Sequence, residues 1–120
     1  MQRKKPKTQP LQVNVPPDIV KVKKIISEWV SRNSRITKVS LFGSYVKKSK
    51  PIPNDIDIAI EISHQENDTA PGFWCGEGSK MEKELSNLLD YQVDLEWFDG
   101  DRTPIIKKGL DEGHIVLYGQ

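Results

Sequence analysis

The chain has 120 residues, of which 36% are hydrophobic, and its formal net charge is +1. This length allows one modest hydrophobic core, and the balanced charge gives no general bias toward polyanions, so nucleic acid binding is not demanded. The single cysteine excludes an internal disulfide framework and, with only two histidines, gives no zinc ligand set. No apolar run approaches ~20 residues and no signal-peptide segment begins the chain, so we expect a cytoplasmic protein without membrane contact.

The chain is predicted to divide into a flexible basic tail over residues 1–16 and a single domain over residues 17–120. The tail mixes prolines and polar residues with four cationic side chains, Arg3, Lys4, Lys5 and Lys7. Such a composition cannot form a core. A solvated tail is the favoured interpretation, and a basic arm that contacts nucleic acid or an acidic partner is the alternative.

The first predicted helix runs from Pro17 to about Arg32, because apolar residues recur there at helical spacing and Pro17 and Asp18 suit a helix start. Its apolar stripe consists of Ile19, Val22, Ile26, Trp29 and Val30. An aromatic residue on such a stripe is ordinarily buried, so we interpret Trp29 as a core residue rather than as a base-stacking one.

A strand over residues 36–42 is predicted next, and it ends at the pair Gly43-Ser44. A short helix is predicted over residues 44–49. The prolines of the following loop, residues 50–54, would end that helix. A glycine and a hydroxyl residue between a strand and a helix start are typical of a phosphate-binding turn.

Two aspartates on the next predicted strand indicate a metal site. In Asp55-Ile56-Asp57-Ile58-Ala59-Ile60 the side chains alternate, so both aspartates project from one face and the isoleucines from the other. Neighbouring carboxylates repel each other, and a fold keeps such a pair readily when a divalent cation lies between them. Hard oxygen ligands favour magnesium.

A polar, glycine-rich stretch over residues 64–79 is predicted to be a long loop. Phe73 and Trp74 within it would either cover a nucleotide base or anchor a partner, or else fold down onto the core. We treat Cys75 as structural, because no flanking base or cation would activate its thiol. A second packing helix is predicted over residues 80–90.

The strand predicted over residues 91–98 supplies a third acid. Val93, Leu95 and Trp97 lie on one face of it, and Asp94 and Glu96 on the other. If this strand pairs with the Asp55–Ile62 strand, Asp94 approaches the first two aspartates, whereas Glu96 stays peripheral. A turn at residues 99–102, a helix and a last strand complete the predicted order.

These residues resemble the nucleotidyltransferase superfamily typified by DNA polymerase beta, and most closely its small stand-alone members, the minimal nucleotidyltransferases (MNT). The matching motifs are Gly43-Ser44, Asp55-x-Asp57 and Asp94, and the resemblance extends over nearly the whole chain. It implies an α+β fold of two layers, in which helices cover one face of a mixed, twisted sheet. The other face would form an open catalytic cleft.

The resemblance also implies the site. Asp55, Asp57 and Asp94 would be catalytic and would hold two Mg²⁺ ions, with ATP or another nucleoside triphosphate as donor. The triphosphate would be bound by Gly43, Ser44, Lys47 and Lys48. Family members often have Arg and Ser where this chain has Tyr45 and Asn54, and the two lysines could supply the missing positive charge.

The length of the chain limits the functions that it can have, since 120 residues leave little room for a second, substrate-binding domain. The resemblance implies a magnesium-dependent transferase that moves AMP to a hydroxyl of a separate helical HEPN-type protein and so acts as its antitoxin. Two alternatives remain open. One is a non-catalytic nucleotide-binding module that neutralises its partner by occlusion, and the other is transfer to RNA or to a small molecule.

Overall fold

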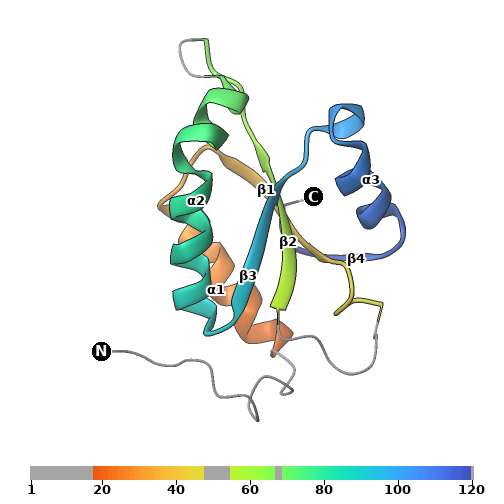
Figure 1. The fold of residues 1–120 in the computed structure, drawn as a ribbon. Coiled ribbons are helices and arrows are strands. Elements are labelled where there is room, and N and C mark those ends of the chain that lie inside the picture. The colour runs from red at the N-terminus through yellow and green to blue at the C-terminus, as the bar shows by residue number, and fades with distance from the viewer. Residues whose placement is uncertain (1–17, 48–54, 67–68, 120) are drawn as a thin grey trace.

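A mixed four-stranded sheet forms the centre of the structure, a computed structural model that describes residues 18–47, 55–66 and 69–119. The strands lie in the order β3-β2-β1-β4 (Figure 1) and are β1 (Ile36–Phe42), β2 (Asp55–Ile62), β3 (Gln92–Trp97) and β4 (His114–Tyr118). β1 is antiparallel to β2 and β4, whereas β2 and β3 are parallel. A parallel pair needs a crossover connection, which the helix α2 (Ala70–Leu89) provides.

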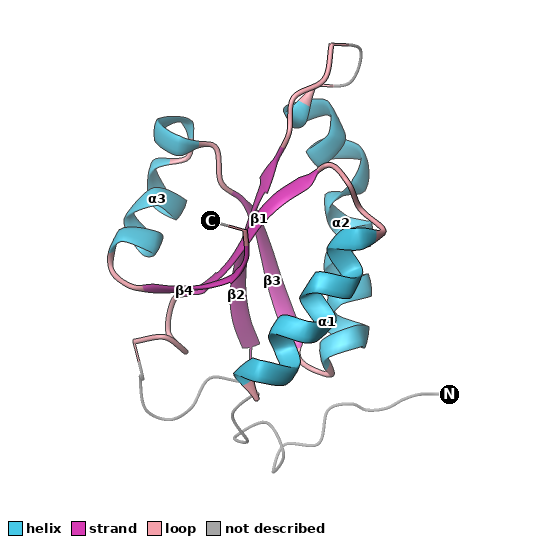
Figure 2. Ribbon diagram, turned by 180° about the vertical axis from the view of Figure 1, so that it is seen from behind, coloured by secondary structure: helices cyan, strands magenta, loops and turns pink. Residues whose placement is uncertain are grey.

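Two helices, α1 (Ile19–Ser31) and α2, cover one face of the sheet (Figure 2). Asp18 caps α1, because its carboxylate accepts the N–H groups of Val20 and Lys21. Trp29 is completely buried, which confirms it as a core residue, and its indole N–H donates to Glu84 of α2 at 2.9 Å. This hydrogen bond joins the two helices across the core.

The alternation predicted for β2 is confirmed. Ile56, Ile58 and Ile60 are buried under α1 and α2, whereas Asp55 and Asp57 are only half-buried and lie on the opposite face. The fold class, an α+β arrangement on a mixed sheet, is therefore as predicted.

One detail of that prediction differs, because the third helix, α3 (Pro104–Asp111), lies on the face opposite α1 and α2. Phe42 and Ala59 are apolar residues on this second face, and α3 buries them with Leu110. The short 3₁₀ turn η2 (Gly100–Arg102) precedes α3, at the position where a turn is predicted. Part of the second face is thus covered, and the remainder carries the aspartates.

The loop predicted over residues 64–79 is wrong from residue 70 onward, where α2 begins. Thr69 caps the helix by accepting the N–H of Gly72 at 3.2 Å, and Pro71 lies in the first turn. Phe73 and Trp74 are half-buried against the core, and the Arg35 guanidinium lies 4.8 Å from the centre of the Phe73 ring. These aromatic residues therefore cover the core rather than a nucleotide.

Cys75 lies on the same helix and is exposed, so it has no structural role in the core. The predicted tail, residues 1–16, lies outside the described residues, and so does the predicted loop at 50–54. Within the described ranges, no helix combines the length and the hydropathy that crossing a membrane would require.

Candidate active site

Three carboxylates meet on the partly open face of the sheet. In the parallel pairing of β2 and β3, Asp57 lies opposite Asp94. Asp55 lies opposite Gln92, two residues earlier on each strand. Paired residues of neighbouring strands present their side chains to the same face. The side chains of Asp94 and Asp55 lie close enough to share a hydrogen bond when one of the two carboxyl groups is protonated. The structure therefore brings together the three aspartates that the strand patterns single out.

The proximity of these groups changes their proton affinities. Burial and the charges of Asp94 and Asp55 raise the pKa of Asp57 above its usual 3.8. Burial, the hydrogen bond with Asp55 and the charges of Asp55 and Glu82 raise the pKa of Asp94. Glu96 lies two residues along the same face of β3, and burial together with the charge of Asp94 raises its pKa also. A positive charge at this place would relieve the repulsion.

The Gly43-Ser44 pair lies directly beside the carboxylates. Gly43 follows Phe42, which is paired with Asp57, and its φ is +80°. A Cβ on Gly43 would overlap the Asp57 carboxylate. Glycine is thus required here both by the backbone conformation and by the close approach of the turn to the acid. Ser44 is exposed.

The short helix predicted over residues 44–49 is replaced in its described part, residues 44–47, by a turn that begins at Gly43. The N–H of Lys47 donates to the carbonyl of Gly43 at 3.1 Å, which closes a single helical turn. The Lys47 ammonium pairs with Glu112, just beyond α3, at 2.5 Å and lowers the pKa of that carboxyl. Lys48 lies outside the described residues.

The donor chemistry at this place fits magnesium, which prefers carboxylate oxygens. No group of three or more His, Cys, Asp or Glu side chains in the described parts of the chain is arranged to hold a metal ion by itself. Magnesium in nucleotide-dependent enzymes is usually bound by one or two carboxylates together with substrate phosphates and water, rather than by an all-protein cage. Asp55 and Asp57 beside the Gly43-Ser44 turn suit that mode.

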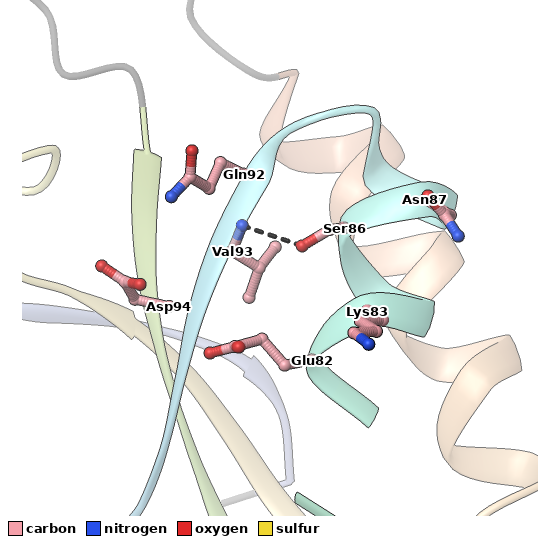
Figure 3. Close-up of a pocket in the computed structure, with 7 residues that line it drawn as sticks. All are labelled: Glu82, Lys83, Ser86, Asn87, Gln92, Val93 and Asp94. Carbon is pink, nitrogen blue, oxygen red and sulfur yellow. Dashed lines mark hydrogen bonds between the residues drawn. The ribbon is translucent and has the colours of Figure 1, made fainter. Parts of the chain in front are cut away.

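Sequence reasoning did not single out two residues of α2 that contact β3 next to Asp94. Glu82 and Ser86 accept backbone N–H groups of this strand and line a hollow of about 350 Å³ between α2 and β3, with Asp94 at its border (Figure 3). The hollow is lined by Glu82, Lys83, Ser86, Asn87, Gln92, Val93 and Asp94. The available signal was a pair of polar residues four apart, next to the apolar Met81 and Leu85 stripe.

Family comparison agrees with this geometry. The model of the polymerase beta nucleotidyltransferase family matches residues 23–120. The chain belongs to this family. As a nucleotidyltransferase, it carries the paired aspartates and the Gly-Ser turn on the two neighbouring strands β1 and β2, and the third aspartate on β3.

Relatives of this nucleotidyltransferase include two proteins of Methanocaldococcus jannaschii that are named as predicted protein adenylyltransferases. One is 32% identical and the other 28% identical, each over 97 residues that make up 81% of this chain and 88% of the relative. They are similar over nearly their whole length.

Solved structures show the same fold. A chain of the complex between a tri-AMPylated Shewanella oneidensis HEPN toxin and an MNT antitoxin superposes with a TM-score of 0.57 at 22% identity, over 86% of this chain and 74% of that one. A chain of a toxin-antitoxin structure with AMP-PNP gives 0.57 at 23% identity, over 82% and 73%.

Replacing Asp57 by Asn is expected to raise the thermal stability of the metal-free nucleotidyltransferase at pH 7. Because the pKa of Asp57 is higher in the folded protein than in the unfolded chain, the folded state binds more protons between these two values, and its stability falls as the pH rises through them. Asparagine has no titrating carboxyl group, so the variant does not lose stability in this way as the pH rises. The advantage should therefore shrink as the pH is lowered toward 3.8 and vanish below it.

Thermal unfolding in EDTA at pH 7 and at about pH 4 measures this difference. Asp101→Asn is the matched control, because the Asp101 side chain is 95% exposed and lies outside the carboxylate group. A lower melting temperature for Asp57→Asn at pH 7 would instead assign Asp57 to a structural network.

Proposed function

We propose that this protein transfers AMP from ATP to a hydroxyl group on a separate HEPN-type partner and thereby acts as its antitoxin in the cytoplasm. The observation that carries the proposal is the juxtaposition of Asp55, Asp57 and Asp94 with the Gly43-Ser44 turn. The names of the relatives support a protein acceptor, and the complex with a tri-AMPylated toxin supports a HEPN-type partner.

The donor site of the proposal is built around the turn. The N–H groups after Gly43 and the Ser44 hydroxyl donate to the triphosphate, and Lys47 adds positive charge once it leaves Glu112. Asp55 and Asp57 would hold one Mg²⁺ ion, and Asp94 would share in holding a second. When bound, magnesium neutralises phosphate charge and lowers the pKa of the acceptor hydroxyl.

The acceptor side depends on Asp94. Asp94 lies opposite Asp57 on the neighbouring strand, so its carboxylate is placed to take the proton of the attacking hydroxyl. The oxygen then bonds to the α-phosphorus, and pyrophosphate leaves along the Gly43-Ser44 turn. The protein orients the two reactants, which is the main contribution of a site of this kind.

The test is incubation of the protein with its co-expressed HEPN-type partner, Mg²⁺ and ATP labelled at the α-phosphate. We expect label on a hydroxyl side chain of the partner and neutralisation by substoichiometric amounts of this protein. Neutralisation that needs stoichiometric protein and no ATP would show occlusion instead. Label on RNA or on a small molecule would move the acceptor to that class.

A further inference from the structure

The outer edge of β3 is attached to α2 on both sides of Asp94. β3 is an edge strand, so the N–H groups of Val93 and Leu95 point away from β2. The Val93 N–H donates to the Ser86 hydroxyl at 3.0 Å (Figure 3), and the Leu95 N–H donates to the Glu82 carboxylate at 2.9 Å. The two acceptors lie one helical turn apart, and the two donors flank the proposed proton acceptor.

The helix that supplies these acceptors is a firm support. Met81, Leu85 and Leu89 on α2 are buried in the main core, so the backbone at residues 82 and 86 is fixed relative to the sheet. Of the two bonds, the one to Glu82 involves a charged acceptor and is the stronger kind. This hydrogen bond also has an electrostatic disadvantage, because it places the negative charge of a further carboxylate near Asp94 and Glu96. A neutral acceptor would satisfy the N–H of Leu95 without that repulsion.

We propose that Glu82 is a positioning residue, which fixes β3 at Leu95 so that the Asp94 carboxylate stays in place beside Asp57. The proposal rests on the proposed function, since it concerns the geometry of the same site. It makes α2 part of the catalytic support, although the helix contributes no side chain to the reacting atoms.

The experiment compares Glu82→Leu, Glu82→Gln and Glu84→Leu. Glu84 is the matched control, because it is a glutamate of the same helix whose carboxylate also accepts a 2.9 Å hydrogen bond, from the Trp29 indole, away from the active site. Glu82→Leu should lower kcat about tenfold with the KM for ATP nearly unchanged, as is usual for residues behind a metal ligand. Glu82→Gln should restore most of this activity, because its amide oxygen still accepts the N–H. Glu84→Leu should lower stability but leave kcat near the wild-type value.

Two measurements do not depend on transfer. Amide hydrogen exchange at Leu95 should accelerate in Glu82→Leu and not in Glu84→Leu. Affinity for a second Mn²⁺ ion, measured in the presence of a non-hydrolysable ATP analogue, should fall about tenfold in Glu82→Leu only. If the wild type transfers no label, the proposed function fails while these readouts still test Glu82. Equal behaviour of Glu82→Leu and Glu84→Leu, or no rescue by Gln, would overturn the positioning role.

Discussion

Asp94→Asn is expected to retain ATP and the first magnesium ion, the one assigned to Asp55 and Asp57, but to lose at least about a hundredfold in transfer rate, the usual contribution of a positioned general base. Asp55 and Asp57 would remain to hold that first ion. The asparagine amide, by contrast, cannot accept the hydroxyl proton. ATP affinity and label transfer should be measured on the same preparation, so that binding and chemistry are compared directly.

Glu96→Gln provides the control on the same strand. Glu96 lies two residues beyond Asp94 on the same face, and it is paired with Ala59 rather than with an aspartate. Burial and the charge of Asp94 raise the pKa of Glu96, as burial and neighbouring acids raise that of Asp94. We expect its removal to change transfer only a few-fold. Unimpaired transfer by Asp94→Asn would leave the proposed site without its third carboxylate, and the two-ion mechanism would have to be abandoned.

Gly43→Val is expected to abolish triphosphate binding. Its branched side chain would overlap the Asp57 carboxylate and block the approach of phosphate to the turn, and its φ of +80° is unfavourable for valine. Ser44→Ala removes one hydroxyl hydrogen bond, which costs about 1 kcal/mol, so triphosphate affinity should fall only about fivefold. Calorimetric titration with a non-hydrolysable ATP analogue measures both variants.

A second glycine separates backbone strain from the local overlap. Gly100 has a φ of +60°, but a Cβ there would meet nothing within 4 Å. Gly100→Val should therefore lower the unfolding temperature through strain alone and leave triphosphate binding intact. Equal losses of binding in Gly43→Val, Ser44→Ala and Gly100→Val would argue against a phosphate-binding turn at Gly43.

The arrangement of the carboxylates could be predicted because strand periodicity is strict. On each of the two strands the aspartates lie on the face opposite the apolar residues. A parallel pairing of these strands then brings Asp55, Asp57 and Asp94 together on one face of the sheet. The start of α2 could not be found in the same way, because Gly72, Gly76 and Gly78 lower helix propensity and interrupt the apolar pattern. Thr69 and Pro71 were the signals that a helix begins there.

The position of α3 could not be predicted from the sequence, for a different reason. Ile106 and Leu110 show that this helix has an apolar side, but they do not show which face of the sheet it covers. That choice depends on Phe42 and Ala59, two apolar residues on the face that carries the aspartates, which become neighbours only through the β1–β2 register. The pairing of Lys47 with Glu112 depends on where α3 lies, so it could not be predicted from the sequence either.

The hydrogen bonds from β3 to α2 also limit how other chains can associate with this sheet. An edge strand normally offers free N–H groups to which a further strand can add, which is a common route to aggregation and to peptide capture. Here the outward N–H groups at Val93 and Leu95 are already bonded within the same chain. A partner protein, or a second copy, therefore has to bind through side chains rather than by extending the sheet at this edge.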